Sequence, residues 1–204
     1  MLDSKGSDVR TVPRVLRGTE QTAKILIVGP FAVGKTTLVK TMSDIRPLLT
    51  EELMTAASVT TDDTTGAPDK STTTVAMDFG RLHLSDELVL YLFGAPGQTR
   101  FHHIFEDFAR GALGALVLVD TRRLEDSFTP IDMLEKHGVP YTVAVNDFDD
   151  APDHNDTALR DALDLLPQTP LVHCDARSHA SVKHALVTLV RYLLARTPDP
   201  EPAV

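Results

Sequence analysis

The stretch Gly29-Pro30-Phe31-Ala32-Val33-Gly34-Lys35-Thr36 decides the fold of this chain of 204 residues. It fits the pattern G-x-x-x-x-G-K-[ST], with an apolar run before it at 23–28 and a helical pattern after it at 37–43. In such a loop the backbone N–H groups point at phosphate groups, and the helix that follows adds the positive end of its dipole. A chance match arises in roughly one chain in a hundred of this length. We therefore predict a phosphate-binding loop.

The residues of this loop have distinct expected roles. The Lys35 ammonium would reach the β- and γ-phosphates of a nucleoside triphosphate, and the Thr36 hydroxyl is an uncharged oxygen suited to Mg²⁺. Further contacts to the nucleotide are expected from the other loop residues and the first turn of the helix: Gly29, Phe31, Ala32, Val33, Gly34 and Thr37. The loop thus predicts a nucleotide with Mg²⁺ as ligand.

Apolar runs alternate with helical patterns along most of the chain, which indicates an α/β fold. Parallel strands are expected at 23–29, 88–93, 115–119, 141–145 and 171–173. The run 74–79 is expected to pair antiparallel with 88–93, and the apolar spacing of 178–196 predicts a last helix with one buried face. We predict a three-layer α/β/α fold around a mainly parallel six-stranded sheet with one antiparallel strand.

Length and composition bound the organisation of the chain. We predict an N-terminal arm at 1–22, one domain at 23–196 and a C-terminal tail at 197–204. A net charge of −9 argues against broad nucleic-acid binding, which needs clustered Lys and Arg. The single cysteine, Cys174, fits a reducing cytoplasm, and no run approaches the length of a transmembrane helix. A cytoplasmic protein without an integral membrane segment is expected.

The stretch Leu92-Phe93-Gly94-Ala95-Pro96-Gly97-Gln98-Thr99-Arg100-Phe101 resembles the W-D-T-A-G-Q-E-R-F segment of the Ras superfamily. The resemblance implies that the Gly97 N–H bonds the γ-phosphate and that Gln98 orients the attacking water. The family's aspartate, which holds Mg²⁺ through water, is Gly94 in this chain. This departure leaves open how the metal ion is held.

A second resemblance concerns Thr74-Val75-Ala76-Met77-Asp78-Phe79, which is similar to the T-I-G-x-D-F of Rab-type switch I. It implies that Thr74 meets Mg²⁺ and the γ-phosphate, although Thr72 and Thr73 are neighbouring alternatives. Asp78 is a candidate to supply, through water, the negative charge missing at Gly94. The alternative for Asp78 is an ordinary edge-strand carboxylate.

Two further segments resemble the guanine-recognition elements of the same superfamily. Asn146-Asp147-Phe148-Asp149 is similar to N-K-x-D, with Asp147 in place of lysine, and the resemblance implies that Asn146 and Asp149 face the nucleotide. Asp149 would accept from guanine N1–H and N2–H₂, a pair of donors that adenine lacks. Cys174-Asp175-Ala176-Arg177 resembles S-A-K, which implies that Ala176 and Arg177 lie near the base.

These elements make residues 23–196 resemble a small Ras-like GTPase. Gly94 and Pro96 are most similar to the MglA-like bacterial GTPases and to the GTP-binding proteins of actinobacterial conservon operons. The resemblance implies a GTP/GDP switch with slow hydrolysis through Gln98, Lys35 and Thr74. It also implies stimulation by a roadblock/LC7-type protein or another operon-encoded partner, and any membrane recruitment would go through that partner. The alternative is a non-hydrolysing guanine-nucleotide-binding scaffold.

Overall fold

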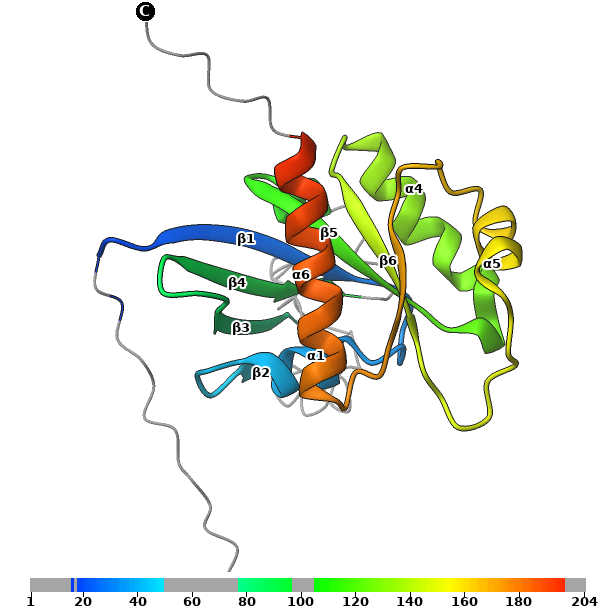
Figure 1. Ribbon diagram of the computed structural model, residues 1–204, viewed down its shortest axis with the longest axis horizontal. Coiled ribbons are helices and arrows are strands. Elements are labelled where there is room, and N and C mark those ends of the chain that lie inside the picture. Colours follow the sequence, from blue (N-terminus) through cyan, green and yellow to red (C-terminus); the bar gives the residue numbers. More distant parts are fainter. Residues whose placement is uncertain (1–15, 17, 50–76, 97–104, 197–204) are drawn as a thin grey trace, which may run out of the picture.

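A seven-stranded sheet with helices on both faces forms the protein (Figure 1). The computed structural model describes residues 16, 18–49, 77–96 and 105–196. The strands are β1 (Gln21–Val28), β2 (Leu48–Leu49), β3 (Asp78–His83), β4 (Leu88–Gly94), β5 (Ala112–Val119), β6 (Tyr141–Asn146) and β7 (Leu171–Cys174). The helices are α1 (Lys35–Met42), α3 (Phe105–Ala109), α4 (Phe128–Lys136), α5 (Asp156–Ala162) and α6 (His179–Arg196), with a 3₁₀ segment η2 (Thr121–Ser127).

The strand order is β2-β3-β4-β1-β5-β6-β7. Strand β3 pairs antiparallel with both of its neighbours, whereas β4, β1, β5, β6 and β7 pair parallel along the sheet. The predicted α/β fold, with a mainly parallel six-stranded sheet and one antiparallel strand, is therefore confirmed. The two-residue strand β2 adds an edge to this sheet, and its short length explains why no sequence pattern predicts it.

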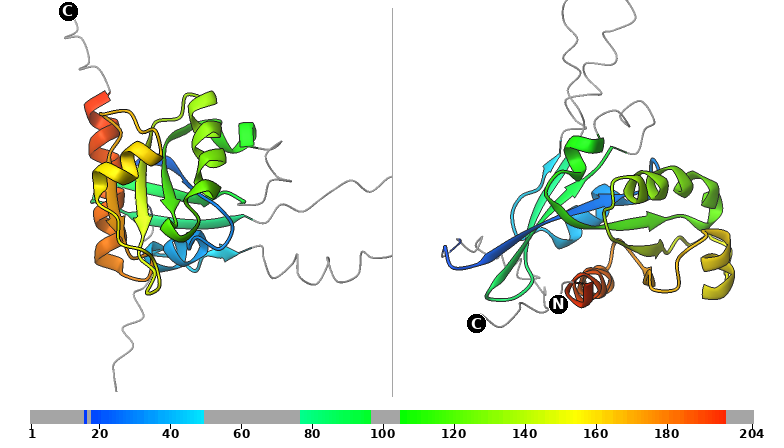
Figure 2. Two further views of the ribbon diagram at one scale, coloured as in Figure 1. Left: turned by 90° about the vertical axis from the view of Figure 1, so that its right-hand side faces the viewer. Right: turned by 90° about the horizontal axis from the view of Figure 1, so that it is seen from above.

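Two layers of apolar side chains cover the sheet. On one face Ile25 and Ile27 pack with residues of α1 and α6, and on the other face Leu26 and Val28 pack with residues of α4. Helices α6 and α4 accordingly lie on opposite sides of the sheet in Figure 2. Because β1 is buried on both faces, its sequence is a continuous apolar run rather than an alternating one. This confirms the three-layer arrangement.

Two boundaries differ from the sequence-based prediction. The antiparallel strand is predicted to end at Phe79, but β3 continues to His83. Phe79, Arg81 and His83 lie on a half-buried face, so charged side chains break the apolar pattern without ending the strand. Strand β1 begins at Gln21, where the first two side chains are exposed and carry no apolar signal.

Among the described residues, no helix combines the length and the apolar character needed to cross a bilayer. Cys174 is buried in the core, and burial raises the pKa of its thiol to about 11. The thiol is therefore protonated at neutral pH and acts as a packing group.

Candidate functional site

The loop between β1 and α1 lies at the carboxyl end of a central strand, where ligands of open α/β sheets bind. Gly29 (φ 142°) and Gly34 (φ 105°) have left-handed backbone conformations, and Ala32 shares this region with φ 62°. A Cβ atom at Gly29 would collide with the carbonyl oxygen of Leu118, and one at Gly34 would lie 2.8 Å from Nδ2 of Asn146. Both glycines are thus required by backbone conformation and by space.

Lys35 folds back over this loop. Its Nζ donates to the carbonyl oxygens of Gly29 (2.9 Å) and Pro30 (2.7 Å), which holds the ammonium group across the loop mouth. The helix α1 begins at Lys35, and the N-cap Gly34 brings no side chain to cap its first N–H groups. The N–H groups at a helix N-terminus together with an ammonium group form a site for an anion such as phosphate.

The side chains of the other loop residues point in different directions. Val33 is fully buried in the core, whereas Phe31 is 58% exposed at the tip of the loop. The side chain of Thr37 is also exposed. The contacts of these residues with a nucleotide stay a prediction.

Thr36 and Asp78 meet beside Gly94. The Thr36 hydroxyl donates to Oδ2 of Asp78 at 2.6 Å, and the Asp78 side chain is almost fully buried. Asp78 on β3 pairs with Gly94 on β4, and a Cβ atom at Gly94 would lie 2.9 Å from the Asp78 Cβ. The φ of Gly94 lies outside the left-handed region, so space alone requires glycine there. The Asp78 carboxylate thus occupies the room that an aspartate at position 94 would need.

Asn146 connects the loop to the segment after β7. Its Nδ2 donates to the Val33 carbonyl at 2.9 Å, and its Oδ1 accepts from the Ala176 N–H at 2.9 Å. The hydroxyl of Thr41 on α1 donates to the Ala176 carbonyl at 2.8 Å. Asn146, predicted to face a nucleotide, therefore has both ends of its amide group bonded to protein backbone, and it positions the loop.

The structure brings Asp149 and Arg177, two predicted site residues, close together. Nη2 of Arg177 lies 3.6 Å from Oδ1 of Asp149, whose side chain is 91% exposed. Arg177 also donates from Nε to Oδ1 of Asp175 at 2.9 Å. That hydrogen bond raises the pKa of Arg177 and lowers the pKa of Asp175. The Asp149 carboxylate is accessible next to a cation that can orient it.

Sequence patterns do not predict the ion pair between the buried Asp120 and the solvent-accessible Arg122, which supports the loop 146–149. Asp120, fully buried, accepts from Nε (2.9 Å) and Nη2 (2.8 Å) of Arg122, and these bonds hold the pKa of Asp120 low. Arg122 also donates to Asp150 at 2.7 Å, and its guanidinium carbon lies 3.8 Å from the centre of the Phe148 ring. The available signal was a polar residue directly after the buried run 115–119, as Asn146 follows 141–145.

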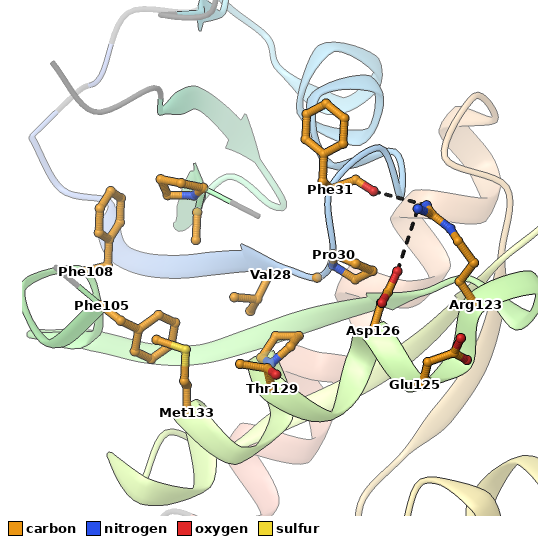
Figure 3. A pocket seen from close by; sticks show the side chains of 14 residues that line it. Val28, Pro30, Phe31, Phe105, Phe108, Arg123, Glu125, Asp126, Thr129 and Met133 are labelled. Carbon is orange, nitrogen blue, oxygen red and sulfur yellow. Dashed lines mark hydrogen bonds and ion pairs between the residues drawn. The ribbon is translucent and has the colours of Figure 1, made fainter. Parts of the chain in front are cut away.

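A pocket of about 260 Å³ opens beside the loop (Figure 3). Pro30 and Phe31 form its wall on the loop side, and Phe105 and Met133 lie opposite. Arg123 enters this pocket from η2 and donates from Nη2 to the Phe31 carbonyl at 3.2 Å. A mixed apolar and charged pocket thus borders the predicted phosphate site.

A family model described as "Conserved hypothetical ATP binding protein" matches residues 27–196. The chain belongs to this family. None of the curated proteins matches this chain.

Solved structures resemble this chain in fold. The G domain of the FeoB iron transporter of T. maritima has a TM-score of 0.60 and 17% identity, over 84% of this chain and 99% of that domain. The cytosolic domain of the same transporter in GDP form II has a TM-score of 0.61 and 17% identity, over 87% of this chain. The chain spans 65% of the length of that cytosolic domain. At this identity the likeness establishes the fold alone.

Three predicted site residues, Thr74, Gly97 and Gln98, lie outside the described residues, as do Thr72 and Thr73. Their roles stay predictions.

Within the described part of the chain, no group of three His, Cys, Asp or Glu side chains could hold a metal ion by itself. The Thr36 hydroxyl and the Asp78 carboxylate are hard oxygen donors within one hydrogen bond of each other, which fits an ion such as Mg²⁺ that also binds phosphates and water.

Proposed function

We propose that this chain is a molecular switch that binds GTP and GDP through the loop 29–36 and hydrolyses GTP slowly. The observation that carries the proposal is the Lys35 ammonium group, held across the loop mouth by the Gly29 and Pro30 carbonyls at the start of α1. A triphosphate can replace these weak carbonyl acceptors with charged oxygens, which form stronger hydrogen bonds. The N–H groups of the loop and of α1 complete the site.

Guanine is the base that we propose. The description of the family refers to ATP, whereas the exposed Asp149 carboxylate beside Arg177 favours a base with two adjacent N–H donors. Arg122, stacked on Phe148 and bonded to Asp120 and Asp150, fixes the loop that carries Asp149. Position 147 of this chain is aspartate instead of the lysine of N-K-x-D. We propose that these Arg122 contacts support the base-recognition loop in its place.

We propose that the chain belongs to the MglA-like or conservon type of GTPase, since Gly94 and Pro96 depart from the Ras pattern in the same way. This subtype implies a cytoplasmic protein whose hydrolysis is stimulated by a roadblock/LC7-type or other operon-encoded partner. The division into an arm at 1–22, a GTPase domain at 23–196 and a tail at 197–204 is part of the same proposal.

Thr36 and Asp78 are the described residues that we propose to hold Mg²⁺, together with Thr74 of the predicted switch I. Bound there, the ion would neutralise charge on the phosphate oxygens. Asp78 has the position to replace the missing aspartate of switch II, because its carboxylate contacts Thr36 and fills the space next to Gly94.

Moving this carboxylate between strands tests the metal site. Asp78→Asn is expected to weaken Mg²⁺ binding in the GTP complex by about 10–100-fold, the usual contribution of a group that orients a metal ligand. Gly94→Asp alone is unsuitable because its Cβ would lie 2.9 Å from that of Asp78. The double variant Asp78→Gly/Gly94→Asp removes this contact and is expected to recover most of the loss seen with Asp78→Gly alone. A Mg²⁺ titration of nucleotide release measures this, and an unchanged Mg²⁺ dependence in Asp78→Asn would refute it.

Turnover separates the switch from its alternative, the non-hydrolysing scaffold. The isolated chain is expected to convert bound GTP to GDP at a rate between about 10⁻⁴ and 10⁻² s⁻¹, the range of GTPases without a stimulating partner. Gln98→Leu is expected to slow this conversion and to leave GTP affinity unchanged. The measurement is quenched single turnover of preloaded GTP. Bound GTP that stays intact for many hours, with and without candidate partners, would favour the scaffold.

A further inference from the structure

Arg123 lies at a break in the backbone that directs it toward the phosphate-binding loop. Inside η2, its φ of −147° and ψ of 58° depart from helical geometry. Its side chain points toward the loop 29–36, where Nη2 donates to the Phe31 carbonyl at 3.2 Å (Figure 3). We propose that Arg123 is an arginine supplied in cis, which contacts the γ-phosphate during hydrolysis. This inference rests on the proposed function.

The neighbouring Arg122 has a structural role, and its contacts differ from those of Arg123. Arg122 uses three side-chain N–H groups on Asp120 and Asp150 at 2.7–2.9 Å, and its guanidinium stacks on Phe148. The Arg123 side chain makes one hydrogen bond, and it forms ion pairs with Asp120 at 3.6 Å and Asp126 at 3.7 Å, both longer than a hydrogen bond. Since a guanidinium has five N–H donors, the described residues leave most of those of Arg123 for another anion.

The position of Arg123 complements that of Lys35. The ammonium of Lys35 bonds the carbonyls of Gly29 and Pro30, and Arg123 bonds the carbonyl of the next residue, Phe31. Two cations thus approach three consecutive carbonyls of one loop. With 43% of its side chain exposed, Arg123 has the freedom to exchange the Phe31 carbonyl, a neutral acceptor, for a phosphate oxygen. The planar guanidinium group, with its paired N–H donors, matches phosphate geometry better than the ammonium group of a second lysine would.

The chemistry explains why a second cation at this loop matters. A water oxygen forms a bond to the γ-phosphorus while the bond from that phosphorus to the β–γ bridging oxygen breaks. The electron pair stays on the oxygen of GDP, and the water proton passes to the released phosphate. Negative charge therefore shifts within the triphosphate, and a guanidinium near the γ-phosphate stabilises the transition state more than the ground state. A stimulating partner then need not provide an arginine and can act by ordering the site.

Three variants of the full chain test the role of Arg123: Arg123→Ala, Arg123→Lys and, as a matched control at the distant end of α6, the exposed Arg196→Ala. Each is assayed for GDP affinity, for single-turnover GTP hydrolysis and for capture of aluminium fluoride by the GDP complex, which mimics the transferring phosphoryl group. Thermal unfolding checks that each variant is folded.

We expect Arg123→Ala to slow hydrolysis about 20–30-fold, the ratio between GTPases with and without an arginine in cis. It should lose aluminium fluoride capture and keep GDP affinity within about twofold, since GDP has no γ-phosphate. Arg123→Lys should recover only part of the rate, and Arg196→Ala should match the wild type. Unchanged hydrolysis in Arg123→Ala, or a wild type that binds GTP without hydrolysing it, would overturn the role of Arg123. A wild type that binds neither GTP nor GDP would instead overturn the proposed function.

Discussion

Replacing Lys35 with methionine is expected to lower the affinity for GTP by about 10²–10⁴-fold. A hydrogen bond to a charged group contributes about 1.5–3 kcal/mol, and the Lys35 ammonium is expected to make one such bond to each of the β- and γ-phosphates. Only the β-phosphate remains in GDP, so the loss of GDP affinity should be about 10–10²-fold. The difference between the two losses identifies Lys35 as a contact to both phosphates.

Lys40 provides the control for Lys35. It is exposed in the last turn of the same helix α1, so Lys40→Met removes the same charge without touching the loop. Titrations with labelled GTP and GDP should give wild-type affinities for this variant. Equal affinities for GTP in folded Lys35→Met and wild type would show that the loop does not bind the triphosphate.

Asp149→Ala is expected to remove most of the discrimination between GTP and ATP. Two hydrogen bonds from a carboxylate to guanine N1–H and N2–H₂ would contribute about 3–6 kcal/mol together, which corresponds to a loss of about 10²–10⁴-fold in GTP affinity. ATP affinity should change little, because adenine offers no such pair of donors. The measurement is the ratio of ATP to GTP affinities in competition titrations.

The control for this substitution is Asp153→Ala, which removes another exposed carboxylate of the loop between β6 and α5 with the same change in net charge. Its affinity ratio should equal that of the wild type. A folded Asp149→Ala protein that still prefers GTP to the wild-type extent would remove Asp149 from base recognition, and with it the reason to favour guanine over the ATP in the family's description.

The fold could be predicted from sequence because its signals are local. The glycines, Lys35 and Thr36 lie within eight consecutive residues, and the loop that they form joins β1 to α1 as the flanking patterns predict. The buried strands likewise appear as continuous apolar runs, since both faces of the sheet are covered.

The contacts between distant segments could not be predicted in the same way. The space next to Gly94 is filled by Asp78 because the register of β3 and β4 pairs these two residues, and no local pattern encodes that register. The resemblance predicts that Asn146 faces the nucleotide, and it gives no signal that the Asn146 amide joins Val33 to Ala176, residues far from it in sequence. The direction of the Arg123 side chain depends on non-helical backbone angles within η2, which the amino-acid composition does not predict.

Equilibrium titration of the full chain with labelled GDP, followed by displacement with unlabelled GTP and ATP, tests the central claim most directly. The structure of the loop 29–36 and the position of Asp149 predict saturable binding at one site, with GTP displacing the label at far lower concentrations than ATP. Displacement by ATP as effective as by GTP would contradict the proposed guanine specificity. Absence of saturable binding by a folded protein in the presence of Mg²⁺ would contradict the account as a whole.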